Sequence, residues 1–137
     1  MGIQNLLPLP MALARAGVHV ACCTSRYPNN DSCLIMEKVV LDLGACIRHC
    51  KEVLGYSRVI LAGWSGGGSL SALYQSQAEH PTITSTPAGD LPNLTKAKLI
   101  PVDAVLQLAA HVGPAPSHAP LSTVLIKPPL CLFFLLL

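Results

Sequence analysis

The residues with the clearest chemical potential form the run Gly63-Trp64-Ser65-Gly66-Gly67, which matches the pattern G-x-S-x-G. The segment 58–62, which is apolar after Arg58 and includes the β-branched Val59 and Ile60, leads into this run, and a segment with helical character, residues 69–79, follows it. In a strand–turn–helix arrangement, a serine on the sharp turn projects its hydroxyl from the carboxyl edge of a sheet. The flanking glycines let strand and helix pass closely. The amide of Gly66, at the helix start, can stabilise an oxyanion. The pattern predicts Ser65 as a nucleophile for acyl transfer.

Two other interpretations of this glycine-rich run stay open. It could be a turn with only a structural role, or a backbone cradle for a phosphate group. The run contains no lysine of the kind that completes a P-loop, and it forms no G-x-G-x-x-G pattern. These features favour the nucleophile interpretation over the phosphate cradle. Trp64, beside the serine, is expected either to border a substrate pocket or to pack against neighbouring elements.

Hydrophobic periodicity and turn residues predict the elements that position Ser65. Apolar residues recur with a helical period from Met36 to Leu54, after Asn30, Asp31 and Ser32, which are candidate N-caps. Alternating strands and helices imply right-handed crossovers and a parallel sheet covered on both faces. The chain is therefore predicted to be α/β, with a three-layer α/β/α arrangement. The expected helices are about 10–16, 36–54 and 69–79, and the expected strands are 18–23, 58–62 and 103–110.

The run GWSGGG, with a strand before it and a helix after it, resembles the centre of the α/β-hydrolase fold, the family of serine hydrolases that includes esterases and lipases. The resemblance covers residues 7–111. It implies that Ser65 is the nucleophile and that the Gly66 amide is an oxyanion donor. It also implies a small-molecule acyl substrate and no cofactor, because this chemistry needs none.

The family's catalytic triad is incomplete in this sequence. Members carry an acid and then a histidine after the serine. His111 follows the last expected strand at the same sheet edge as Ser65, so it is a candidate base or a residue that shapes the pocket. The acids and remaining histidines after Ser65 are expected at the opposite edge, in loops or in the tail; they are Glu79, Asp90 and Asp103, with His80 and His118. We therefore expect weak or no turnover.

The resemblance also implies that an interior strand of the family's sheet is missing. Its loss would leave unpaired backbone groups on the two neighbouring strands. Either those strands close against each other, or the chain folds poorly alone. The chain is thus predicted to be an incomplete, truncated α/β-hydrolase core. The alternative is a non-catalytic fragment that binds a partner through exposed sheet edges and an apolar tail.

The end of the chain differs in character from the rest. Residues 1–113 are predicted to form the partial core, whereas residues 114–137 are rich in proline and end in an apolar run. That run is much shorter than the roughly 20 residues of a membrane-spanning helix. We expect residues 114–137 to lie outside the domain and to favour self-association or aggregation.

Composition excludes some classes of function. The 137 residues suit one domain, 51% are hydrophobic, and only 12% are charged. The net charge of +2 comes from scattered basic residues, so no nucleic-acid partner is predicted. No secretory signal or transmembrane segment is recognisable, which predicts a cytoplasmic location.

The six cysteines lack the spacing of a zinc ribbon, so reduced thiols are expected. Cys46, His49 and Cys50 could present metal ligands on one helix face. However, both cysteines belong to the apolar stripe of their helix, which favours buried, unreactive thiols over a metal site. Cys22 and Cys23 are expected to point to opposite faces of a strand.

Overall fold

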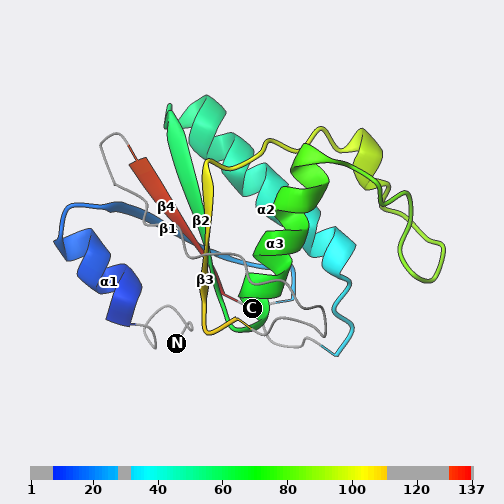
Figure 1. Cartoon of the computed structure of the whole chain (residues 1–137), viewed down its shortest axis with the longest axis horizontal. Coiled ribbons are helices and arrows are strands. Elements are labelled where there is room, and N and C mark those ends of the chain that lie inside the picture. The colour runs from blue at the N-terminus through cyan, green and yellow to red at the C-terminus, as the bar shows by residue number, and fades with distance from the viewer. Residues whose placement is uncertain (1–7, 28–31, 111–129, 137) are drawn as a thin grey trace.

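Parallel strands form the centre of the structure, a computed structural model that describes residues 8–27, 32–110 and 130–136 (Figure 1). The described elements, in chain order, are α1 (Pro8–Arg15), β1 (His19–Thr24), α2 (Met36–Arg48), the π-helical turn η2 (His49–Val53), β2 (Arg58–Trp64), α3 (Gly66–Glu79), the 3-10 turn η3 (Leu94–Lys96), β3 (Ala104–Leu108) and β4 (Leu130–Leu136).

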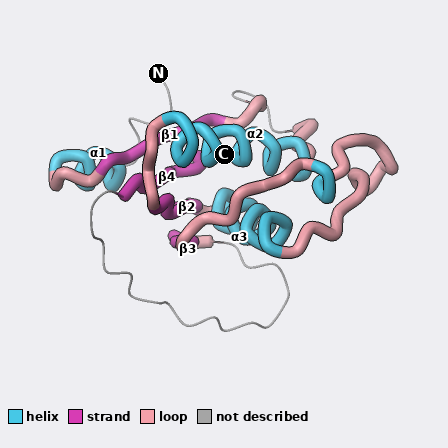
Figure 2. Tube along the Cα trace, turned by 90° about the horizontal axis from the view of Figure 1, so that it is seen from above, coloured by secondary structure: helices cyan, strands magenta, loops and turns pink. Residues whose placement is uncertain are grey.

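The described strands form one four-stranded sheet in the order β1-β4-β2-β3, which Figure 2 shows from above. All neighbouring strands are parallel. Strand β4 pairs on both sides: Phe133 lies opposite Ala21 of β1 and opposite Leu61 of β2. The α/β class and the parallel sheet predicted from the sequence are confirmed, as a sheet of four described strands.

The position of β4 corrects the expectation for the end of the chain. Residues 130–136 were expected to lie outside the domain, yet they form an interior strand. The expected closure of the two neighbouring strands does not occur, because β4 lies between β1 and β2 and pairs with both. The physical reason is that a parallel strand buried on both faces needs a continuous apolar run, which these residues supply. Residues 114–129 lie outside the described residues.

Helices contact the sheet on both faces (Figure 1). On one face, α2 and α3 pack over Val59 and Leu61 of β2. On the other face, Leu9 and Leu13 of α1 pack against Ile60 and Ala62 of the same strand, together with side chains of β1 and β3. The alternation of side chains along β2 therefore divides the core into two clusters.

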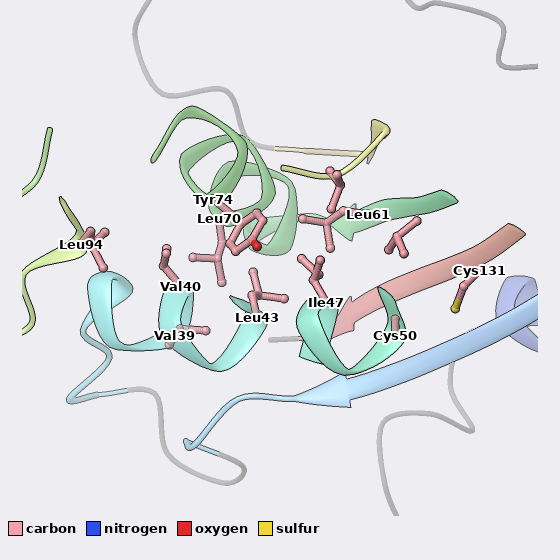
Figure 3. Close-up of a cluster of buried hydrophobic side chains, with 12 residues drawn as sticks. Val39, Val40, Leu43, Ile47, Cys50, Leu61, Leu70, Tyr74, Leu94 and Cys131 are labelled. Carbon is pink, nitrogen blue, oxygen red and sulfur yellow. The ribbon is translucent and has the colours of Figure 1, made fainter. Parts of the chain in front are cut away.

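The larger cluster lies between α2, α3 and the sheet (Figure 3). The sequence forms these helices because apolar residues recur every three or four positions, which places them on one face. Tyr74 of α3 is fully buried, and its hydroxyl donates a hydrogen bond to the carbonyl of Ile100 at 2.8 Å. Each fully buried large side chain contributes about 1.5–3 kcal/mol. Those on the two helices are Val39, Val40, Leu43, Ile47, Leu70 and Tyr74.

The ends of the predicted long helix differ from expectation. Ile35 occupies the N-cap of α2 without a side-chain hydrogen bond, so Ser32 is not the cap; Asn30 and Asp31 lie outside the described residues. At the other end, the chain continues from α2 into η2, and Gly55 follows at a φ of 73°. A glycine tolerates this left-handed conformation, which fits its expected role in ending the helix. None of the helices in the described part of the chain is both long and apolar enough to cross a membrane.

Candidate functional site

Ser65 is the single residue between β2 and α3. Strand β2 runs through Trp64, and α3 begins at Gly66, so both elements extend further toward the serine than the sequence predicted. The entire change of direction falls on Ser65, whose φ is 51° and whose ψ is −118°. Residues with a Cβ rarely adopt this conformation. The expected strand–turn–helix arrangement is therefore present, with a sharper bend than the expected turn over 63–68.

Hydrogen bonds hold the backbone of Ser65 on both sides. Its N–H donates to the carbonyl of Leu108 at the end of β3, at 3.0 Å. Its carbonyl accepts from the N–H of Gly68 in the first turn of α3, also at 3.0 Å. Such a backbone conformation costs about 1–3 kcal/mol and persists only where the surroundings impose it. Strand β3 and helix α3 impose it here.

Close packing around the bend explains two of the glycines. A Cβ on Gly63 would overlap the backbone of Gly67, and a Cβ on Gly68 would overlap the side chain of Ala110. The glycines two residues before and after Ser65, Gly63 and Gly67, were expected to have this role; the structure gives it to Gly63 and, on the helix side, to Gly68 in place of Gly67. A run of consecutive glycines does not reveal which one a distant segment approaches, and Ala110 lies far along the chain.

The two neighbours of Ser65 are accessible. Gly66 is exposed and is the first residue of α3, where backbone N–H groups have no intrahelical acceptor. The helix dipole adds partial positive charge at this point. Trp64 follows a stretch of buried residues in β2, and its own exposed fraction is 45%. The site thus presents a hydroxyl-bearing residue, a backbone donor and an indole at one edge of the sheet.

A second strained residue lies at the same edge. Ala109, which follows β3, has a φ of 47°. Because Leu108 accepts the hydrogen bond from Ser65, the two strained residues meet at the carboxyl ends of neighbouring strands. Backbone strain gathers at functional sites more often than elsewhere.

The acids that follow Ser65 in the described residues serve other contacts. The Asp103 carboxylate accepts from the N–H of Val59 at 2.8 Å and lies 3.0 Å from the Lys51 ammonium, at the start of β2. Glu79, the last residue of α3, accepts from Gln75. His111 and His118 lie outside the described residues, and His111 directly follows Ala110.

The remaining acid and histidine also lie away from Ser65. Asp90 is on the exposed part of the loop after α3, where its N–H and carbonyl bond to Thr86. His80 is the C-cap of α3, at the far end of that helix from the serine. The structure therefore brings together Trp64, Ser65 and Gly66, and adds no described acid to them.

No family model, curated protein or solved structure matches this chain.

A separate hollow lies at the opposite edge of the sheet. It is lined by residues at the start of β1, by the loop after η2 and by Cys131 of β4. In its wall, Nδ1 of His19 lies 2.7 Å from the Tyr56 hydroxyl. Since β1 is parallel to β2, its first residues lie at the amino edge, away from Ser65. This hollow does not belong to the serine site.

The cysteines are arranged differently from the expected buried thiols. Cys50 is buried, but Cys46 is only half-buried, and its sulfur lies 2.9 Å from the sulfur of Cys23. His49 is exposed at the start of η2, and no group of three metal-ligating side chains forms among the residues that the structure describes. The contact between Cys23 and Cys46 was missed, because strand alternation and the helical stripe give the face of each cysteine on its own element but not which elements pack together.

Proposed function

We propose that this chain is an incomplete α/β-hydrolase core in which Ser65 is the nucleophile for hydrolysis of a small acyl substrate. The observation that carries the proposal is the backbone of Ser65, a strained residue between a parallel strand and a helix. In this proposal, the three layers are helix α1 on one face, the parallel sheet in the middle, and helices α2 and α3 on the other face. Strand β4 then stands where the family has the interior strand that this sequence lacks.

The residue type at the bend supports a chemical role for the serine. A structural turn at positive φ favours glycine, which adopts that conformation without strain. This segment is rich in glycine, yet serine occupies the strained position and glycines occupy the positions that follow. A serine at a position where its backbone conformation costs stability favours a function for its hydroxyl.

The proposed reaction follows from the groups at this edge. The Ser65 hydroxyl oxygen attacks the acyl carbonyl carbon, and the Gly66 N–H donates to the oxyanion that forms. A base takes the Ser65 proton and passes it to the alcohol or thiol as the bond between the acyl carbon and this leaving group breaks. Water then hydrolyses the acyl-serine, which frees the carboxylic acid and restores the Ser65 hydroxyl. Trp64 offers an apolar surface beside the acyl group. His111 is the candidate base, and turnover is slow because no described acid orients an imidazole at this edge.

A fluorophosphonate probe tests the nucleophile directly. Ser65 Oγ should displace fluoride from phosphorus and add one probe to the intact mass. Ser65→Ala should abolish this labelling, whereas the control Ser76→Ala, on the exposed side of α3, should retain it. His111→Ala should slow labelling if His111 is the base. An unlabelled Ser65 in a sample with a cooperative thermal transition would overturn the proposal.

A further inference from the structure

Cys23 and Cys46 form a pair of thiols between the sheet and α2. Cys23 lies on β1 and packs into the cluster beneath α2, whereas its neighbour Cys22 packs into the cluster on the opposite face. Cys46 lies on the sheet-facing side of α2. The two sulfur atoms are 2.9 Å apart, and neither residue is fully buried.

The environment of this pair differs from that of the other thiols in the core. A hydrogen bond from Cys46 lowers the pKa of Cys23 to about 7, although burial and the charge of Asp42 act in the opposite direction. The same hydrogen bond and burial raise the pKa of Cys46. Cys131, which is only 2% exposed, has a pKa raised to about 12 by burial. Burial also raises the pKa of Cys22. Cys23 is therefore the member of this set with the most thiolate character.

We propose that Cys23 and Cys46 are a redox-active dithiol that hydroperoxides oxidise to a disulfide, which links β1 to α2. The geometry requires little movement. A disulfide has an S–S length of about 2.05 Å, so the sulfurs approach by about 0.9 Å from their present separation.

The chemistry balances with hydrogen peroxide as the oxidant. The Cys23 thiolate attacks one peroxide oxygen, so an S–O bond forms, the O–O bond breaks and hydroxide leaves to become water. The Cys46 sulfur then attacks the Cys23 sulfur, so the S–S bond forms, the S–O bond breaks and a second water leaves. Two thiols lose two electrons and two protons in total, and peroxide is reduced to two waters. A small dithiol reverses the reaction by thiol–disulfide exchange.

The disulfide should stabilise the folded chain. The cysteines are separated by 23 positions, so the bond would close a loop of moderate length in the unfolded state. Loop closure of this kind removes conformational entropy from the unfolded chain. We expect Tm to rise by about 5–10 °C on oxidation, and to return after reduction.

The experiment compares the full chain treated with hydrogen peroxide and with dithiothreitol. Cys22→Ser serves as the background, because Cys22 and Cys23 share the tryptic peptide 16–26. In this background, oxidation should remove two hydrogens from the intact mass and link peptide 16–26 to peptide 39–48, which contains Cys46. Adding Cys23→Ser or Cys46→Ser should abolish both the link and the rise in Tm. Cys33→Ser, which changes an exposed cysteine, should leave both intact.

Other outcomes would overturn the proposal. A link from peptide 16–26 to Cys33 would show that a different pair reacts. Accumulation of sulfinic acid on Cys23 would show that Cys46 does not resolve the sulfenic acid. If Cys23→Ser unfolds the chain, Cys23→Ala and the mass of the oxidised parent still decide the question. Because none of these readouts depends on Ser65, the result is independent of fluorophosphonate labelling.

Discussion

Ser65 has a Cβ at a position whose backbone conformation favours glycine. Its φ of 51° lies in the region that glycine enters freely and that other residues enter at a cost. The N–H of Ser65 is held by Leu108 and its carbonyl by Gly68, so the strain cannot relax without breaking these bonds. The hydrogen bonds to β3 and α3 thus hold Ser65 in its strained conformation.

Substitutions at Ser65 should separate strain from chemistry. Ser65→Gly should be more stable than Ser65→Ala by about 1 kcal/mol, because only the alanine retains the strained Cβ. Urea unfolding followed by circular dichroism measures the difference. The same two changes at Ser76, inside α3, should give the reverse order, with alanine about 1 kcal/mol more stable than glycine. An alanine preference at Ser65 would mean that this residue lies in ordinary helix.

Helix α3 is held to the rest of the protein by partly buried polar contacts as well as by apolar packing. The side chain of Gln75 donates to the carbonyl of Val102 at 3.1 Å and accepts from its N–H at 3.0 Å. The Tyr74 hydroxyl bonds to Ile100. These bonds attach the helix to the segment that enters β3. They therefore fix the strand whose far end holds Ser65.

Tyr74 should make stability depend on pH in alkaline solution. Burial raises its pKa from 10.0 to about 12, so the folded state favours the neutral phenol. The stabilisation of the folded state by the neutral Tyr74 phenol is present in full below pH 10. It is lost as the pH rises from 10 to about 12. Tyr74→Phe should lack this loss, and it should cost about 1 kcal/mol at neutral pH because the Ile100 carbonyl loses its partner. Thermal melts of the parent chain and of Tyr74→Phe from pH 7 to 12 measure how the Tm of each depends on pH. A difference in Tm that stays constant over this range would contradict the prediction.

Local patterns predict local features of this molecule. The apolar periods of α2 and α3 and the strand before Ser65 are properties of neighbouring residues, so they could be predicted from the sequence. Trp64, Ser65 and Gly66 are also neighbours, and their proximity follows from the chain itself. The role of Gly68 and the contact between Cys23 and Cys46 depend on segments that meet only in the folded state. Those features require the arrangement of elements as well as their identity.

Strand order is the property of the whole molecule that the sequence did not predict. The apolar run at 130–136 is too short for its period to distinguish a strand from other apolar segments. Its parallel partners, β1 and β2, lie far earlier in the chain, so no hairpin turn marks the pairing. The family resemblance predicted a gap between β1 and β2, but it carried no information on what would fill that gap.

The sheet should depend on β4 because this strand joins β1 to β2. An interior strand uses its N–H groups on both sides, so a proline at Phe133 removes a ladder donor and introduces a steric conflict. Phe133→Pro should lower the free energy of unfolding by about 3 kcal/mol or more relative to Phe133→Val, which keeps the N–H and introduces an apolar, β-branched side chain that suits a strand. Guanidinium unfolding followed by circular dichroism measures the difference.

Since Ser65 depends on β2 and β3 for its position, Phe133→Pro should also reduce fluorophosphonate labelling, whereas Phe133→Val should preserve it. Equal midpoints for the two variants would show that β1 and β2 hold together without this strand.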